Sequence, residues 1–302
     1  MKAAPFAYVR PTRLDDAIGE LQAAQGGGGK VIAGGQSLVP VLAMRLGRPS
    51  TLVDITRVEE LTQMEVTGQQ LRVGAAVRQR RVQREASQLV PLLGLALPWV
   101  GHREIRSRGT VCGSLAHADP SAEMPAVALS LGATLQVTGP EGDRQVSGAD
   151  FFTGAMATVA GPADIVTSAT FPTARADEGY GFAEIASRHG DYAIAGVAVR
   201  VRTASGTVQE AVITSFGVSD RPQLRDLRGS LQQAVDALGD PAASVTDLAK
   251  ALEEPAQAMA DDVVTTAGDA HGSPAYRRRL VRVLAARELA RAYRSSLKGT
   301  QP

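Results

Sequence analysis

Cysteine is almost absent from this chain, and neither sign of charge prevails. Cys112 is the single cysteine of 302 residues, which excludes an intramolecular disulfide, a thiolate zinc site and an iron–sulfur cluster held by this chain alone. Lys and Arg number 32 against 31 for Asp and Glu, and a net charge of +1 provides no bulk field for binding nucleic acid or an anionic membrane. No apolar run reaches the ~18–20 residues that span a bilayer. Residues 1–6 lack the apolar stretch of a signal peptide, so a cytoplasmic location is expected.

Aromatic residues are also few, at 4% of the chain, whereas glycine is abundant, with 31 residues. Hydrophobic residues make up 44%, which is enough for a sizeable core and too many for a disordered chain. At roughly 150 residues per domain, the length predicts two domains. The four histidines, His102, His117, His189 and His271, show no metal-ligand spacing, so no metal site is expected.

The first part of the chain is expected to alternate helices and strands. Apolar residues at helical spacing predict helices over Leu14–Leu21, Leu38–Leu46, Val77–Leu97 and Glu123–Leu131, with a break near Pro91 in the third. Short apolar runs predict strands over Val31–Ala33, Thr51–Ile55, Leu71–Ala75, Thr134–Thr138 and Asp164–Phe171. Between them, Gly101–Pro120 has no clear periodicity, and so long an irregular segment in a compact domain is usually functional.

The remainder of the chain changes character. Three strand-like runs, Gly181–Arg188, Ala193–Thr203 and Val208–Val218, predict an antiparallel meander. Helices are then expected over Leu227–Leu238, Val245–Glu254 and Pro274–Leu297. The predicted fold class is α+β, with an α/β part followed by a three-stranded antiparallel sheet and helices.

A glycine turn at residues 33–37 follows one predicted strand and precedes a helix. Successive backbone N–H groups in such a turn point into one concavity, a nest that binds phosphate oxygens without a lysine. Gly34 and Gly35 allow positive φ and close backbone approach, and Ser37 can cap the helix or donate to an oxygen. An ordinary tight turn is the alternative interpretation.

A second cluster rich in small residues covers residues 110–120, with carboxylates at Asp119 and Glu123. Two separated nests could clamp the adjacent phosphates of a pyrophosphate, and the carboxylates could accept from sugar or ribityl hydroxyls. A Gly/Ser loop with a capping aspartate is the alternative here.

Three motifs, in order along the chain, resemble one family. Residues 33–38 (AGGQSL) match the first FAD-binding motif of the medium, flavin-carrying subunit of the molybdenum hydroxylases, such as the xanthine dehydrogenase and carbon monoxide dehydrogenase family. Residues 101–123 resemble that family's second motif, GHxxIRNRGTVGGNLAHADP. Residues 187–193 (SRHGDYA) resemble the opening of its C-terminal domain, and 273–278 (SPAYRR) also look similar, so the resemblance covers nearly the whole chain.

The resemblance implies FAD as the cofactor, in a two-part FAD-binding domain similar to the vanillyl-alcohol oxidase type. The implied domains are 1–56 and 57–175, the two α/β parts of the FAD-binding domain, and 176–302, the C-terminal sheet and helices. By position, the two pyrophosphate loops and their motifs comprise Ala33, Gly34, Gly35, Gln36, Ser37, Leu38, Thr110, Val111, Cys112, Gly113, Ser114 and His117. His102, Asp119 and Glu123 would approach the adenosine or ribityl side. Tyr192 would lie near the isoalloxazine ring, and Ile165 and Phe182 would line the flavin pocket.

Three positions depart from the family pattern. Cys112 stands where the family usually has the first glycine of a pair, and Ser107 and Ser114 stand where it has asparagine. Because Cys112 carries a Cβ, its φ is expected to be negative. A redox nucleophile and a small buried thiol are the two interpretations of this cysteine.

The resemblance also implies an electron-transfer subunit rather than a complete enzyme. A large molybdopterin-binding subunit would oxidise the substrate, and a small [2Fe-2S] subunit would pass the electrons to FAD in this chain, within a dimer of heterotrimers. The sequence leaves open the substrate and the final electron acceptor. A stand-alone FAD-dependent oxidase and a flavin-free assembly module are the alternatives. The basic run at Arg78, Arg80, Arg81 and Arg84 is interpreted as a solvated helix face, with a partner-docking surface as the alternative.

Overall fold

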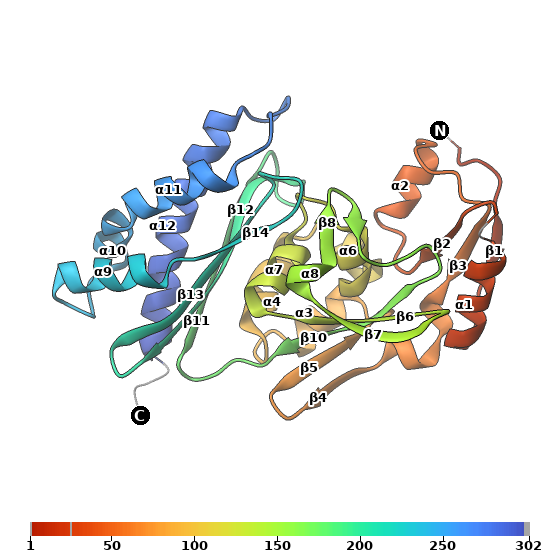
Figure 1. Ribbon diagram of the computed structural model, residues 1–302, viewed down its shortest axis with the longest axis horizontal. Coiled ribbons are helices and arrows are strands. Elements are labelled where there is room, and N and C mark those ends of the chain that lie inside the picture. Colours follow the sequence, from red (N-terminus) through yellow and green to blue (C-terminus); the bar gives the residue numbers. More distant parts are fainter. Residues whose placement is uncertain (1, 25, 299–302) are drawn as a thin grey trace. The chain divides into compact units, whose positions relative to one another are not determined.

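The computed structural model describes residues 2–24 and 26–298, and the chain divides into two compact units (Figure 1). The first unit comprises Met1–Glu85, His102–Ala118 and Gly132–Pro172, and the second comprises Ala86–Gly101, Asp119–Leu131 and Thr173–Pro302. Each unit contains helices and a sheet, which confirms the α+β class. The finer division at residues 56/57 and 175/176 stays a prediction.

A three-stranded parallel sheet forms the N-terminal part of the first unit, with the strand order β1-β3-β2. Its strands are β1 (Ala7–Val9), β2 (Gly29–Ile32) and β3 (Thr51–Asp54), and its helices are α1 (Leu14–Ala23) and α2 (Leu38–Ala43). Helix α1 buries Ala17, Ile18 and Leu21, which lie on one helix face, and it packs against β2 and β3. Because the three strands run in the same direction, the residues that follow them meet at one edge of the sheet.

A five-stranded antiparallel sheet, in the order β4-β5-β10-β6-β7, supports the rest of the first unit. Its strands are β4 (Met64–Thr67), β5 (Gln70–Gly74), β6 (Thr134–Gly139), β7 (Gly142–Ser147) and β10 (Ile165–Pro172). The remaining elements are η1 (Ile55–Arg57), η2 (Glu59–Thr62), α3 (Gln79–Glu85), α5 (Arg103–Arg108), α6 (Val111–His117), α8 (Gly148–Phe151), β8 (Phe152–Gly154) and β9 (Ala157–Thr158). The sequence prediction missed β4 and β7, which are the edge strands of this sheet.

The prediction that Gly101–Pro120 is irregular was wrong, because the segment forms the short helices α5 and α6. Thr110 caps α6: its Oγ1 accepts a hydrogen bond from the backbone N–H of Gly113 at 3.0 Å. The apolar residues of α6 face the interior, and the helix packs against β5 and β10. The cap and this buried face fix a helix in which Gly113 weakens the local propensity.

Replacing Thr110 by alanine is expected to destabilise the protein by about 1 kcal/mol, because the cap of α6 is lost and the N–H of Gly113 loses its partner. Chemical denaturation measures the loss, and Thr110→Ser, which keeps the hydroxyl, serves as the control. Equal destabilisation by both substitutions would show that the methyl group, and not the cap, is what matters.

A four-stranded antiparallel sheet in the order β11-β12-β13-β14 forms the centre of the second unit (Figure 1). Its strands are β11 (Glu178–Ala186), β12 (Ala193–Ala204), β13 (Thr207–Phe216) and β14 (Gln223–Asp226). The sequence predicted only three of these four strands. It missed β14, because this strand has only four residues and none of them is buried. The helices are α4 (Pro91–Ala96), η3 (Leu97–Trp99), α7 (Glu123–Leu131), α9 (Arg228–Leu238), α10 (Val245–Ala251), α11 (Glu253–Val263) and α12 (Pro274–Lys298). The predicted helix Val245–Glu254 is split between α10 and α11.

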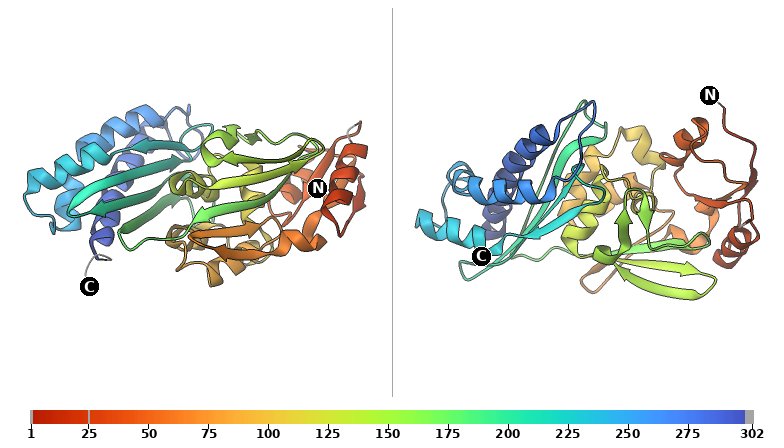
Figure 2. Two further views of the ribbon diagram at one scale, coloured as in Figure 1. Left: turned by 60° about the horizontal axis from the view of Figure 1, so that its bottom comes forward. Right: turned by 45° about the horizontal axis from the view of Figure 1, so that its top comes forward.

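Different helices cover the two faces of this second sheet (Figure 2). Helix α12 packs along β11 and β12 on one face, where a Cβ at Gly181 would lie 2.7 Å from the carbonyl oxygen of Glu288. Helices α4 and α7 pack on the other face, and there Ser130 of α7 donates a 2.7 Å hydrogen bond to Thr214 of β13. Among the described residues, no helix has the length and apolar character needed to cross a membrane.

Candidate cofactor site

Within the first unit, the first glycine turn (residues 33–37) lies in direct contact with the second loop, which is the connection between α5 and α6 around Arg108 and Gly109. A Cβ at Gly34 would lie 2.6 Å from the Cα of Gly109 and would also overlap the carbonyl oxygen of Arg108. Gly35 has a φ of +72°, which disfavours other residues. Both expected properties of the glycine pair are therefore present: Gly34 allows the close backbone approach, and Gly35 adopts the left-handed backbone conformation.

The start of helix α3 supports the second loop. Arg78 donates a side-chain hydrogen bond to the carbonyl oxygen of Arg108. The backbone N–H of Gln79 donates to the carbonyl of Gly109 at 2.8 Å, and its Nε2 donates to the carbonyl of Thr110 at 3.4 Å. Gln79 is buried, so the second loop is fixed by the interior of the first unit.

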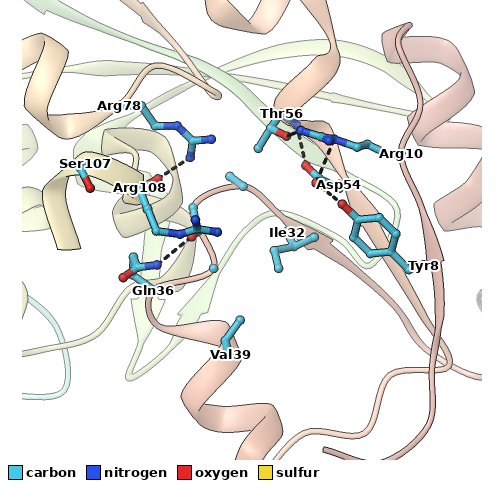
Figure 3. Close-up of a pocket in the computed structure, with 13 residues that line it drawn as sticks. Tyr8, Arg10, Ile32, Gln36, Val39, Asp54, Thr56, Arg78, Ser107 and Arg108 are labelled. Carbon is cyan, nitrogen blue, oxygen red and sulfur yellow. Dashed lines mark hydrogen bonds and ion pairs between the residues drawn. The ribbon is translucent and has the colours of Figure 1, made fainter. Parts of the chain in front are cut away.

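A cavity of about 600 Å³ opens beside the first loop, at the edge where the parallel strands end (Figure 3). Arg78 and Arg108 lie on one side of it, and Tyr8, Arg10 and Asp54 lie on the other. The complete lining consists of Tyr8, Arg10, Ile32, Ala33, Gly34, Gly35, Gln36, Val39, Asp54, Thr56, Arg78, Ser107 and Arg108. The carboxyl edge of a parallel sheet is where α/β proteins bind their ligands.

Positive charge predominates in this cavity, with three guanidinium groups and one carboxylate among the lining residues. Arg10 forms an ion pair with Asp54 at 3.2 Å. Within the described residues, no carboxylate lies at ion-pair distance from Arg78 or Arg108. Burial, and then the charge of Arg108, lowers the pKa of Arg78. A bound anion would relieve the repulsion between these two side chains.

Asp54 is held rigidly at the opposite side of the cavity. Its Oδ1 accepts the backbone N–H of Thr56 at 2.8 Å, and its Oδ2 accepts the hydroxyl of Tyr8. Burial alone would raise the pKa of Asp54, but the hydrogen bonds from Thr56 and Tyr8 outweigh it and lower the pKa. The carboxylate is thus ionised and orients Tyr8 and Arg10.

The two loops differ in the backbone amides that they offer. In the described part of the chain, no hydrogen bond engages the amides of Gly34, Gly35 and Gln36. In the second loop, the amide of Gly113 donates to Thr110 Oγ1, and that of Ser114 donates to the Thr110 carbonyl at 3.2 Å. The first loop, with the guanidinium groups around it, is therefore the part that fits a diphosphate.

The other predicted site residues are distributed over both units. In the first unit, His102 is exposed at the start of α5, His117 is half-buried at the end of α6, and Ile165 is buried at the start of β10. The second unit contains Asp119, Glu123, Phe182 and Tyr192. Tyr192 is 62% exposed, and the ring of Phe182 is stacked on Phe216 at a centroid distance of 5.8 Å.

Cys112 lies inside α6 with the negative φ that was expected. Its thiol is buried and donates to the carbonyl oxygen of Val73 at 3.4 Å. Burial raises the pKa of the thiol to about 12, so the thiolate that a redox nucleophile requires is not formed near neutral pH. The small buried thiol is the interpretation that the structure supports.

Comparison with known proteins defines the class. A family profile described as the FAD binding domain in molybdopterin dehydrogenase matches residues 4–174, and the CO dehydrogenase flavoprotein C-terminal domain matches residues 180–292. The chain belongs to this family of FAD-binding medium subunits of molybdenum hydroxylases, and FAD is its cofactor. Two observations on the residues of this chain agree with FAD as the cofactor. A side chain at Gly34 would block the close approach of the first turn to the second loop. Arg78 and Arg108, which no carboxylate in the described residues neutralises, line the cavity beside the backbone amides of the first turn.

Individual relatives match along nearly their full length. The chain is 36% identical to 6-hydroxypseudooxynicotine dehydrogenase complex subunit alpha of Paenarthrobacter nicotinovorans, over 97% of this chain and 96% of that protein. It is 29% identical to the carbon monoxide dehydrogenase medium chain of Afipia carboxidovorans, over 95% and 96%. Among solved structures, quinoline 2-oxidoreductase from Pseudomonas putida 86 superposes with a TM-score of 0.85 at 33% identity, covering 98% of this chain and 100% of that one.

Proposed function

We propose that this chain takes electrons from the [2Fe-2S] clusters of a small subunit and passes them through FAD to an external acceptor, while a large molybdopterin-binding subunit oxidises the substrate. Family membership along the whole chain supports the electron-transfer role, because several relatives are named as subunits of larger complexes. The contact between the two glycine-containing loops, beside a cavity rich in guanidinium groups, is the observation that carries the FAD-binding part.

FAD, when bound, supplies a ring that accepts and releases electrons; this chain supplies its binding and orientation. We infer that the amides of Gly34, Gly35 and Gln36 donate to phosphate oxygens, and that Arg78 and Arg108 neutralise the phosphate charge. Ala33, Ser37 and Leu38 complete the first motif, and residues 110–114 hold the second loop against it. Asp54 would keep Arg10 and Tyr8 oriented toward the same ligand.

The remaining assignments are part of the same proposal. His102, Asp119 and Glu123 would approach the adenosine or ribityl side of FAD, His117 belongs to the second motif, and Ile165 and Phe182 would line the flavin pocket. Tyr192, which is 62% exposed, would lie near the isoalloxazine ring. A dimer of heterotrimers in the cytoplasm is the proposed assembly and location.

The function is tested by purifying the chain alone and again after co-expression with candidate large and small subunits. The isolated chain is expected to bind one FAD, to show flavin absorption at about 450 nm, and to oxidise no organic substrate by itself. Substrate-dependent flavin reduction is expected only when all three subunits are present, and sedimentation measures the assembly. Failure to bind added FAD, or aerobic turnover of a substrate by the isolated chain, would contradict the proposal.

A further inference from the structure

Helix α2, which follows the first glycine turn, is apolar but has little of its surface buried. Its sequence, LVPVLA, contains no polar side chain, yet Leu42 is the one buried residue of the six. The residues after the helix continue this pattern, because Met44 is 48% exposed and Leu46 is 75% exposed. Soluble proteins rarely leave several large apolar side chains exposed together, and such a surface usually marks an interaction site.

A tight turn at the end of α2 holds these residues in place. The backbone N–H of Arg45 donates to the carbonyl of Leu42 at 3.0 Å. The N–H of Leu46 donates to the carbonyl of Val41 at 3.1 Å, which completes a Schellman motif. The left-handed position of this motif usually carries glycine, but here it carries Arg45, with a φ of +58°. The fold of the turn therefore does not require a guanidinium group at this position.

The N-terminal segment extends the exposed surface. Arg45 Nε donates to the carbonyl of Lys2 at 3.1 Å, and the backbone N–H of Ala7 donates to the carbonyl of Ser50 at 2.8 Å. The segment thus runs alongside the residues that follow α2, and it exposes Phe6. Six exposed side chains together form what we call the α2 patch: Lys2, Phe6, Met44, Arg45, Leu46 and Arg48.

The charged side chains of the α2 patch are all positive. Residues 1–14 and 21–53 contain no aspartate or glutamate, although the whole chain has 31. Within the part of the chain that the structure describes, Lys2, Arg45 and Arg48 form no ion pair. The patch therefore has an apolar centre and a basic rim, which complements a partner surface with an apolar centre and a negative rim.

This charge separates the possible occupants of the α2 patch. A second copy of the chain, docked through the same patch about a two-fold axis, would bring its basic residues against those of the first. Lipid-binding segments usually gather about four to eight basic residues, more than the three of this patch. A negatively charged protein surface is the occupant that the patch fits.

The patch is continuous with the cofactor cavity through the first turn of α2. Val39 lines the cavity and is half exposed (Figure 3). Its backbone N–H donates to the carbonyl of Gly35 at 2.9 Å, which ties α2 to the first glycine turn. A helix of six residues is only about 9 Å long. A protein seated on the patch would therefore lie close to the ligand in the cavity, where an electron donor has to dock because electron transfer slows steeply with distance.

We propose that the α2 patch is the docking surface for the [2Fe-2S] subunit. This inference rests on the proposed function, in which that subunit delivers electrons to FAD. A [2Fe-2S] cluster held by four thiolates carries net negative charge, which the basic rim complements. Met44 and Leu46 would be buried at the centre of the contact, and Arg45 and Arg48 would bind carboxylates around it.

Titration of the FAD-loaded chain with the purified [2Fe-2S] subunit tests the apolar centre. Leu46→Asp is expected to weaken binding by at least about 30-fold, the effect typical of a residue at the centre of an interface. Its FAD content should stay that of the wild type, because Leu46 is exposed and does not line the cavity. Val66→Asp, at an exposed apolar position of β4 in the same unit, is the matched control and should bind as the wild type does. Wild-type affinity in Leu46→Asp would overturn the proposal.

Position 45 separates docking from folding. Arg45→Gly places the preferred residue in the left-handed turn, so the isolated chain should be at least as stable as the wild type. The same variant is expected to bind the [2Fe-2S] subunit about 5- to 20-fold more weakly, with a smaller dependence on salt. Arg48→Glu should weaken binding further, whereas Arg279→Glu, an equal charge change at an exposed position of α12, should not. Equal losses in the variants of Arg48 and Arg279 would contradict the basic rim.

The outcomes separate this proposal from the proposed function. If the wild type binds the [2Fe-2S] subunit and the variants of the α2 patch bind it equally well, the docking surface is wrong and the proposed function stands. If the wild type binds no [2Fe-2S] subunit, both are wrong. Another occupant is shown, and the proposal overturned, if Leu46→Asp retains the subunit but dissociates a dimer of the isolated chain or releases it from anionic phospholipid vesicles. Slower flavin reduction by the reduced [2Fe-2S] subunit in Leu46→Asp, with unchanged reduction by dithionite, would support the proposal.

Discussion

Alanine at position 34 is expected to weaken FAD binding by about 10- to 100-fold. The added Cβ would lie 2.6 Å from the Cα of Gly109 and would overlap the Arg108 carbonyl oxygen. These are backbone atoms, held by hydrogen bonds from Gln79 and Arg78, so they cannot move aside cheaply. Overpacking of this kind costs about 1–3 kcal/mol, and a loop displaced by the contact would no longer aim its amides at one phosphate. Fluorescence titration of the flavin-free protein with FAD measures the change.

Gly19→Ala provides a matched control within the first unit. A Cβ at Gly19 meets nothing within 4 Å, and its position in helix α1 favours alanine. This variant should bind FAD as the wild type does and should be equally or more stable. If Gly34→Ala also keeps the wild-type affinity while its circular dichroism is unchanged, the contact between the two loops is not what forms the phosphate site.

Replacement of Arg108 by glutamine is expected to lower FAD affinity by about 10- to 150-fold. Arg108 lines the cavity, and no carboxylate in the described residues neutralises it. A charged hydrogen bond to a phosphate contributes about 1.5–3 kcal/mol, which sets the size of the loss. The affinity of the variant should also depend less on salt concentration than that of the wild type. Titration at two ionic strengths measures both effects.

Arg84→Gln is the control for charge alone. Arg84 lies exposed on α3 and does not line the cavity, yet its substitution changes the net charge by the same amount. It should leave FAD affinity within about twofold of the wild type, since an exposed charge that does not line the cavity is weakened by solvent and salt. Equal losses in the Arg84 and Arg108 variants would mean that the phosphate charge is not recognised at this cavity.

Local sequence pattern predicted the elements that have strong periodicity or clear ends. Helix α7 has the predicted bounds, Glu123–Leu131, because its apolar run is uninterrupted and almost wholly buried. Helices α5 and α6 were missed, since Gly109 and Gly113 break the apolar pattern and the Thr110 cap compensates only in the folded structure. In α12, Glu288 is a charged residue among the buried, mostly apolar residues of the helix. It is buried there, within 3.0 Å of Arg287 and 2.8 Å of Arg291.

The candidate site was only partly accessible to sequence reasoning. Each of its two glycine-containing segments can be recognised in the local sequence. Their proximity could be expected because both were predicted to bind the same pyrophosphate. The side chains of Tyr8, Arg10, Asp54, Thr56, Arg78 and Arg108 were missed, because they come from separate segments that only the tertiary fold brings together. Asp54 had one usable signal: it ends a buried parallel strand, where ligand-binding side chains gather. Arg78 was grouped with a solvated helix face, but it lines the cavity.

The interleaving of the two units bears on how the chain is made. During synthesis, α4 and α7 emerge before the strands β11, β12 and β13 that they will cover. Eight of the nine residues of α7 are buried in the folded protein. During synthesis this apolar helix is therefore exposed until the strands that cover it have been made. No single cleavage of the chain could release either unit whole, because each contains segments from both sides of the other. While residues 132–216 are being synthesised, α7 therefore has no complete sheet to pack against.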